Sequence, residues 1–521
     1  MLDFFAVYAP WQRRLWNVGM LLALKEIVEG SDAVRDRALS QASLDWFRES
    51  LRARIGQDPG VGDKQQLKAV QAALHTRIAA DGESHRVLRQ VGADIKGNYL
   101  RRWHDALAMD NHGHQPERVA RAFASHLLDA GISQDHLHRW LTFLRDHDAT
   151  EHDVGSIAVA GEALLARDRK RFRVLVLFET PFPSTVTPPP EWLTRPAAQQ
   201  WLVDLGLDRL LGDVEHRGGL LLRVRSSDPE AAVEAAGEIV DAVVARVAVG
   251  ARTEMRPHPA CVVRGQTQRR YELRRRRRVD VRSLARQERL THNLDAINKG
   301  PVDSALQLLS HLDASSPETA VAGGWSAIES LLTAPGDEQG NVAVADRMAA
   351  LVACAWPRAE LTTLAWRRIE AIDDSFSRRL ETVDTNEERA RLVASEIQAG
   401  NWLQLTPAGD ETAERRMAKL LANPSTVLRD VEAHAAVAFR RLYRQRNLVV
   451  HGGRTGAVAL RASLRTASPL VGAGMDRIVH AHLVTGTHPL DLTARASLEL
   501  ARAGSRDGRD LTALLETSSV E

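Results

Sequence analysis

The chain has 521 residues, of which 44% are hydrophobic, and its formal net charge is only +2. This length predicts two or three domains, and the small net charge excludes a protein that is basic throughout, so any attraction for nucleic acid has to come from local basic segments. The two cysteines, Cys261 and Cys354, match no metal-binding spacing and favour a reducing, intracellular compartment over a disulfide framework.

Residues 1–165 are predicted to form a helical N-terminal domain, because apolar residues recur at helical spacing from Trp11 onward. The apolar run from Val18 to Leu24 is too short to span a bilayer and lacks a clear cleavage pattern, so we interpret it as part of a buried helix. No other run approaches the length of a transmembrane helix, and we expect a soluble cytoplasmic protein without a membrane partner.

Histidines are frequent in this first domain, which raises the question of a metal site. Their spacings match no compact ligand template and cysteines are absent from the region, so we predict solvated or core-edge histidines, with no metal and no cofactor. The histidines are His104, His112, His114, His126, His136, His138, His147 and His152.

Residues 166–268 are predicted to form a small α/β module. Strand-like runs occur at 173–178, 219–224 and 261–263, and helical patterns at 197–211 and 229–247. This order favours a small α/β sandwich of ferredoxin-like type. Neither glycine-rich phosphate-binding motif is present in the sequence, so we assign the module a role in recognition or dimerisation rather than a nucleotide.

Residues 269–292 form an arginine-rich linker. A run of this kind can neutralise several phosphates and attract RNA, but it is equally typical of a solvated linker, and the sequence leaves both readings open. The candidate RNA-binding residues in this run are Arg274, Arg275, Arg276, Arg277 and Arg278.

Residues 293–521 are predicted to be helical. Helix pairs are expected at 344–356 with 358–372 and at 457–467 with 472–485, with a capping box of Thr385 and Glu388 opening another helix. A long helix is expected from Val427 to Val450, directly before the double glycine Gly452-Gly453.

The end of that long helix carries the residues most suited to chemistry, Arg446, Asn447 and His451. An arginine can grip a phosphate through two parallel hydrogen bonds, and a histidine can take or give a proton near neutral pH. Together they suit cleavage of a phosphodiester that carries its own nucleophile, the 2′-hydroxyl of RNA, without a metal.

These residues resemble the R-N-x-x-x-H signature of HEPN-domain ribonucleases, in particular the Apea-like branch, with Val450 and Gly452 also matching. The segment 324–332, which contains Glu329, is similar to an earlier core helix of that domain. The resemblance covers about the last two-fifths of the chain and implies a HEPN helical bundle over residues 293–521.

The resemblance implies a metal-independent endoribonuclease that leaves a 2′,3′-cyclic phosphate and a 5′-hydroxyl. His451 would transfer protons, Arg446 would hold the scissile phosphate, Asn447 would orient it, and Glu329 would hydrogen-bond Arg446 or His451. Arg440 and Arg444 would extend the basic surface toward RNA. The family setting further implies a defence or toxin effector, with an unidentified trigger or partner protein sensed by the other regions.

Residues five apart on a regular helix point about 140° away from each other, so Arg446 and His451 would not converge on one atom. Either the helix ends before His451, as the glycines make plausible, or two motifs face each other across a dimer axis. The resemblance implies the second arrangement, a homodimer with a composite site. The alternative function is a non-catalytic HEPN scaffold that binds RNA or protein.

Overall fold

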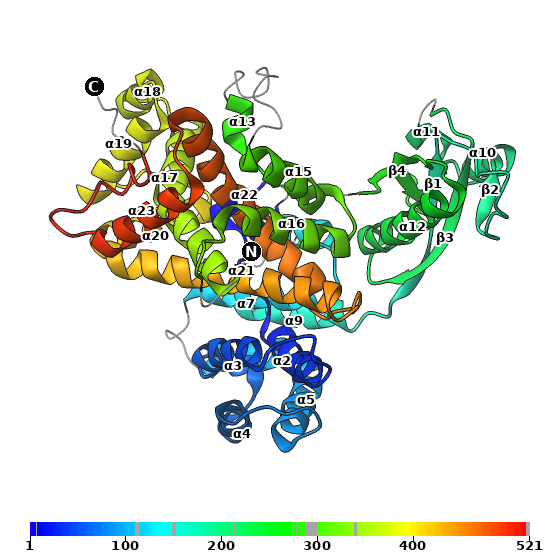
Figure 1. Cartoon of the computed structure of the whole chain (residues 1–521), viewed down its shortest axis with the longest axis horizontal. Coiled ribbons are helices and arrows are strands. Elements are labelled where there is room, and N and C mark those ends of the chain that lie inside the picture. Colours follow the sequence, from blue (N-terminus) through cyan, green and yellow to red (C-terminus); the bar gives the residue numbers. More distant parts are fainter. Residues whose placement is uncertain are drawn as a thin grey trace. The chain divides into compact units, whose positions relative to one another are not determined.

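A computed structural model of the chain describes residues 1–6, 8–109, 115–147, 153–211, 214–274, 276–277, 279–286, 300–337 and 341–516. The described chain is mainly helical and contains one small antiparallel sheet (Figure 1). Among these residues, no helix combines the length and the apolar character needed to cross a membrane.

The chain divides into two compact units. The first unit contains Met1–Val7, Leu100–His114 and Phe123–Arg276, and the second contains Tyr8–Tyr99, Gln115–Ala122 and Arg277–Glu521. The predicted boundaries differ from this division, because residues 8–99 group with the C-terminal helices rather than with the rest of 1–165. The physical reason is a shared interior: Trp16 and Leu39 belong to the same hydrophobic core as Trp325 and Phe439.

The first unit is built around a five-stranded sheet with the strand order β2-β3-β1-β4-β5, in which every neighbouring pair is antiparallel. Its strands are β1 (Lys170–Phe178), β2 (Trp192–Thr194), β3 (Gly218–Ser226), β4 (Pro257–Val263) and β5 (Tyr271–Glu272). Its helices are α1 (Leu2–Phe5), α6 (Tyr99–Met109), α8 (Gln134–His147), α9 (Val154–Leu165), α10 (Arg195–Asp204), α11 (Asp208–Leu211) and α12 (Pro229–Ala251), and α7 (Pro116–Asp129) spans both units.

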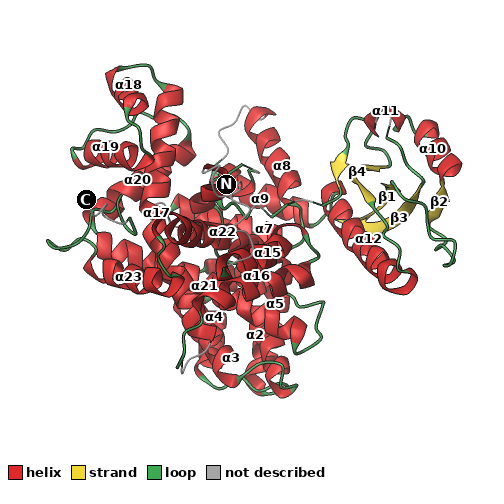
Figure 2. Cartoon of the chain, turned by 45° about the horizontal axis from the view of Figure 1, so that its top comes forward, coloured by secondary structure: helices red, strands yellow, loops and turns green. Residues whose placement is uncertain are grey.

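Alternation along β1 sends its side chains to opposite faces of the sheet. Val174 and Val176 pack with residues of α12, whereas Leu175 and Leu177 pack with residues of α10 and α11, so helices cover both faces (Figure 2). The element order also differs from the ferredoxin-like pattern βαββαβ, because α10 follows the second strand instead of preceding it. The segment before β2 contains five prolines between 181 and 190, which cannot donate backbone hydrogen bonds to a helix.

The second unit is helical. Its N-terminal part contains η1 (Trp11–Arg13), α2 (Met20–Arg35), α3 (Gln41–Ile55), η2 (Pro59–Val61), α4 (Lys64–His75) and α5 (Glu83–Ile95). Its C-terminal part contains α13 (Arg282–Arg286), α15 (Pro301–Ala314), α16 (Pro317–Leu332), α17 (Asn341–Ala371), α18 (Ser375–Thr382), α19 (Asn386–Gln398), α20 (Ala408–Ala422), α21 (Pro424–Val450), α22 (Leu460–Thr485) and α23 (Pro489–Arg502).

Two expected helix breaks are absent. We predicted an interruption at Pro357 and one between residues 467 and 472, but α17 and α22 each continue through an internal proline, Pro357 and Pro469. An internal proline costs roughly 3 kcal/mol, and burial of both helices in the core offsets this loss. The capping box of Thr385 and Glu388 at the start of α19 is confirmed, as is the long helix that ends at Val450.

Candidate active site

The motif side chains meet where α21 ends. The last helical residue is Val450, and the backbone amides of His451 and Gly452 both donate to the carbonyl oxygen of Asn447, at 2.9 and 3.1 Å. Gly453 adopts a left-handed conformation with φ of 60°, which glycine tolerates better than other residues. The chain therefore leaves the helical path directly after the motif.

This helix end brings Arg446 and His451 together within one chain. Nη1 of Arg446 lies 2.9 Å from Nε2 of His451, and the same Nη1 donates to Oδ1 of Asn447 at 3.1 Å. An arginine only donates, so Nε2 of His451 accepts, and the proton of the neutral ring lies on Nδ1. The expectation that these two side chains diverge is therefore wrong.

Two of the three other arginine–histidine pairs with this spacing lie wholly in the second unit and provide an internal comparison. Arg429 with His434 and Arg477 with His482 lie inside α21 and α22, and neither pair is hydrogen-bonded. Nδ1 of His434 instead lies 2.6 Å from the backbone oxygen of Asp430. In these two regular helices, residues five apart therefore stay separate, as helix geometry predicts.

The three motif residues differ in their access to solvent. His451 is exposed, Arg446 is half-buried and Asn447 is buried. The structure describes no partner for Nε or Nη2 of Arg446, so these donors remain available to a ligand. The arrangement offers a guanidinium for an anion and, next to it, an imidazole nitrogen that can accept a proton.

Glu329 does not join this group. It lies on α16, which packs against α21 through Trp325 and Tyr443, whose ring centroids are 4.9 Å apart. Among the described residues, its side chain makes no hydrogen bond to Arg446 or His451, and only its backbone oxygen is engaged, by Thr333. The predicted role of Glu329 as a direct partner of these two side chains is therefore not supported by the geometry.

Arg444 was predicted to contribute to an RNA-binding surface, but it is 1% exposed. Its Nη2 donates to the backbone oxygen of Glu26, and its guanidinium lies over the ring of Phe47, 4.7 Å from the centroid. Burial lowers the pKa of Arg444, although the charges of Glu26 and Glu29 act in the opposite direction. Arg444 is a structural residue because it anchors α21 to α2 and α3.

Arg440 is also engaged within the protein. It donates to both carboxylate oxygens of Asp346, each at 2.6 Å from Nη2, and stacks over Trp46 at 4.5 Å. A guanidinium bound in this bidentate way is committed to its carboxylate. The predicted surface of Arg440 and Arg444 is therefore not a free basic patch.

Sequence reasoning missed the support that α2 gives to the motif helix. The buried carboxylate of Glu26 accepts from Nε of Arg441 at 2.9 and 3.0 Å. After the motif, Glu29 accepts from the amide of Val458 at 3.0 Å, and Arg454 pairs with Asp36. Helix α2 and the residue that follows its end thus hold the chain on both sides of His451.

The arginine-rich linker has several different environments. Arg274 pairs with Asp241, Arg276 is exposed, and Arg277 donates through Nη1 to the carbonyl oxygens of Leu312 and Ser315, at 3.0 and 2.9 Å. Arg277 therefore caps the C-terminal end of α15, a role that differs from the predicted RNA contact. Arg275 and Arg278 lie outside the described residues.

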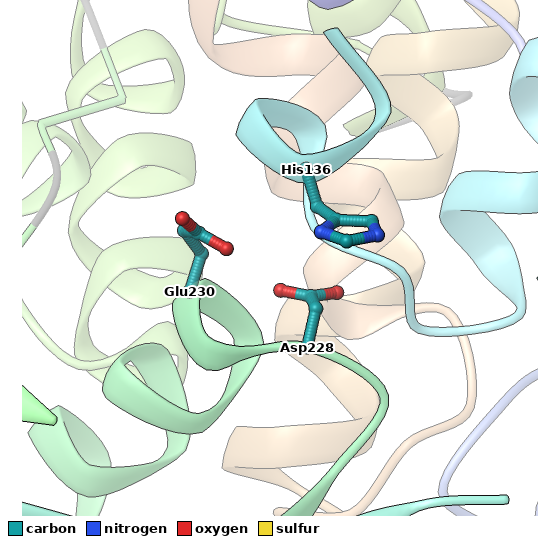
Figure 3. A group of neighbouring side chains, drawn as sticks. All are labelled: His136, Asp228 and Glu230. Carbon is teal, nitrogen blue, oxygen red and sulfur yellow. The ribbon is translucent and has the colours of Figure 1, made fainter. Parts of the chain in front are cut away.

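A second cluster of titratable side chains lies in the first unit (Figure 3). Ligand-type atoms of His136, Asp228 and Glu230 lie within 4.8 Å of one another. Asp228 caps α12 by accepting from the amide of Ala231 at 2.8 Å and also accepts from the hydroxyl of Ser133 at 2.7 Å.

Glu230 is bound by two guanidinium groups in the same cluster. Its Oε1 accepts from Arg139 and Arg269, at 2.5 and 2.8 Å. These two cations and the positive end of the α12 dipole oppose the binding of a third cation. We therefore interpret this cluster as an ionic contact that joins α8 to α12. Of the histidines considered above, His112, His114 and His152 lie outside the described residues.

No family model, curated protein or solved structure matches this chain. The contact between Arg446 and His451 is therefore the feature of this chain that best indicates a function.

Proposed function

We propose that the chain is a metal-independent endoribonuclease of HEPN type that cleaves RNA through attack by the 2′-hydroxyl. The observation that carries the proposal is the 2.9 Å contact between Nη1 of Arg446 and Nε2 of His451 at an exposed helix end. This contact supports the proposal because a guanidinium can bind a phosphate and the adjacent imidazole nitrogen can accept a proton, the two functions that this reaction needs.

In the proposed reaction, the scissile phosphate replaces His451 as an acceptor for the guanidinium of Arg446. Nε2 of His451 is then free to take the proton of the 2′-hydroxyl. The O2′ atom forms a bond to phosphorus while the bond from phosphorus to O5′ breaks, and O5′ receives a proton. The products are a 2′,3′-cyclic phosphate and a 5′-hydroxyl, with no oxidation or reduction.

Asn447 supports this arrangement by accepting from Nη1 of Arg446, which fixes the guanidinium near the helix end. A homodimer is part of the proposal, following the HEPN resemblance. In it, the partner subunit's His451 supplies the proton that O5′ receives. A defence or toxin role in the cytoplasm, with RNA as the target and a separate trigger, is proposed on the same resemblance.

The test is cleavage of pooled RNA by the full chain, with and without EDTA, followed by analysis of the RNA ends. We expect cleavage in EDTA, cyclic phosphate ends, and loss of cleavage in His451→Ala. The matched control is His434→Ala, because His434 is also exposed on α21 and five residues after an arginine that it does not contact.

Three results would contradict the proposal: cleavage at the native rate by the His451→Ala variant, inhibition by EDTA, or products with a 3′-hydroxyl. Binding of RNA without any cleavage by the native chain would instead favour the non-catalytic scaffold.

A further inference from the structure

A cavity of about 490 Å³ lies within the second unit, separate from the residues proposed for RNA cleavage. It is lined by α17, the start of α19, the middle of α22, the segments 8–14 and 280–283, and Glu516. Its volume falls within the range of small-molecule sites, roughly 300–1,000 Å³. The polar side chains that line it show what chemistry it can accept.

A carboxylate of the chain itself occupies two arginines of this cavity. Oε1 of Glu516 pairs with Arg477, at 2.6 Å from Nη2, and with Nη1 of Arg358. Burial raises the pKa of Glu516, but the charges of Arg477 and Arg358 outweigh it and lower the pKa to about 2. The two guanidiniums therefore bind an anion that the chain itself supplies, the carboxylate of Glu516.

One carboxylate, that of Glu516, pairs with both guanidiniums and brings a single negative charge to the pair. Burial and the neighbouring charge of Arg477 lower the pKa of Arg358, while the charges of Glu516 and Glu387 raise it. In addition, Nε of Arg477 is buried and has no described hydrogen-bond partner. A group with more charge and more acceptor oxygens would suit the two arginines better than Glu516 does.

A further feature of the lining suits a nucleotide. The start of α19 contributes no anion site, because its capping box already joins Thr385 to the carboxylate of Glu388. Trp366 also lines the cavity and is 43% exposed, while the guanidinium of Arg389 lies 4.8 Å from its ring centroid. The exposed indole surface offers an aromatic platform for a base.

We propose that this cavity binds a phosphate monoester of nucleotide size, with Arg358 and Arg477 binding the phosphate in place of Glu516. The proposal does not depend on ribonuclease activity, because both the site and the test concern binding alone. It assigns Glu516 the role of an internal competitor that a stronger anion displaces.

Calorimetric titration of the full chain with AMP tests the proposal, with inorganic phosphate and adenosine as separate probes. We expect AMP to bind more tightly than phosphate, and adenosine to bind weakly. Glu516→Gln keeps the shape of the side chain but removes the competing charge. It should tighten AMP binding about tenfold, equivalent to about 1.4 kcal/mol. Arg477→Gln should weaken AMP binding by at least as much.

The matched control is Arg415→Gln, because Arg415 is an exposed arginine that pairs with Glu411 on α20. It should leave AMP affinity unchanged. The Glu516→Gln variant could be less stable than the native chain, so the unfolding temperature of each is also measured with and without AMP. AMP should raise the unfolding temperature of the variant by more than it raises that of the native chain. Equal affinities of the native and Glu516→Gln chains for AMP, or adenosine binding as tightly as AMP, would overturn the proposal.

Discussion

Nη1 of Arg446 lies 2.9 Å from Nε2 of His451, although five residues separate the two side chains. The contact lies where α21 ends at Val450, just before the backbone leaves the helical path at Gly453. Within α21, Arg429 and His434 have the same spacing and do not meet. The spacing of the residues is therefore not enough by itself to create the candidate site.

The first prediction concerns Arg446. Replacing Arg446 by alanine should abolish cleavage and also weaken RNA binding, because the guanidinium is proposed to contact the scissile phosphate. His451→Ala should lower the cleavage rate by about a hundred- to ten-thousandfold, the usual value of proton transfer, but leave RNA binding nearly intact. Filter binding and single-turnover cleavage measure the two effects separately.

Arg429→Ala is the control for this pair of variants, because Arg429 is an arginine of the same helix with no contact to its histidine. It should cleave like the native chain. If Arg446→Ala and His451→Ala weaken RNA binding to the same extent, the separate roles assigned to the two side chains are wrong.

The second prediction concerns the support from α2. Glu26→Gln leaves Arg441 buried without its carboxylate partner, and removal of one member of a buried ion pair typically costs about 3–5 kcal/mol. We expect a lower unfolding midpoint in urea and reduced cleavage, because α2 holds the motif helix. Glu49→Gln, an exposed carboxylate on α3, is the control and should change neither. Native stability in the Glu26→Gln variant would refute this structural role.

Local signals explain why the motif helix could be predicted. The helical periodicity and the stop at Gly452-Gly453 are both contained within about thirty residues of sequence, and the structure confirms that helix and its end. The role of α2 could not be predicted in the same way, because Glu26 and Arg441 are 415 positions apart. A sequence pattern gives no information on which distant helix neutralises a charge.

The arginines of α21 illustrate a second limit. Arg440 and Arg444 are of the residue type expected on an RNA-binding face. Arg440, however, is bound to Asp346, and Arg444 is buried against α2. The type of a charged residue does not reveal whether its partner is a phosphate or a carboxylate of the same chain. The breaks predicted at Pro357 and near Pro469 are wrong for a related reason. Tertiary packing keeps both helices continuous despite the strong local preference of proline for a helix break.

The third prediction separates the arginines of the linker. Replacing Arg274 and Arg276 by glutamine should weaken RNA binding and reduce its dependence on salt. The slope of log affinity against log salt should fall by about 0.7 for each lost phosphate contact with single-stranded RNA. RNA binding measured from 50 to 200 mM salt tests this. An unchanged slope would mean that these arginines contact solvent rather than RNA phosphates. Arg277→Gln should instead lower stability, because Arg277 caps α15.

The fourth prediction concerns pH and His136. Burial lowers the pKa of His136, with help from the charges of Arg139 and Arg167, while Asp228 and Glu230 act to raise it. Because the folded pKa lies below the unfolded value of about 6.5, the unfolded chain binds a proton first as the pH falls. This residue should therefore destabilise the fold progressively below about pH 6.5.

Histidine NMR titration, with the signal assigned by its absence in His136→Gln, measures this pKa directly. The signal should titrate below the ordinary range of histidine. Titration above pH 6.5 would mean that the carboxylates of Asp228 and Glu230 outweigh the burial of the ring.

The last prediction concerns the proposed dimer. Each chain brings its own Arg446 and His451 into contact, so one chain supplies a phosphate-binding group and one imidazole. The proposed reaction uses two imidazoles, one to take the proton from the 2′-hydroxyl and one to give a proton to O5′. A heterodimer of one native chain and one His451→Ala chain, isolated with two different tags, should therefore retain far less than half of the native activity. An activity close to half would mean that each chain cleaves RNA alone, and a chain that is only monomeric in sedimentation would refute the dimer itself.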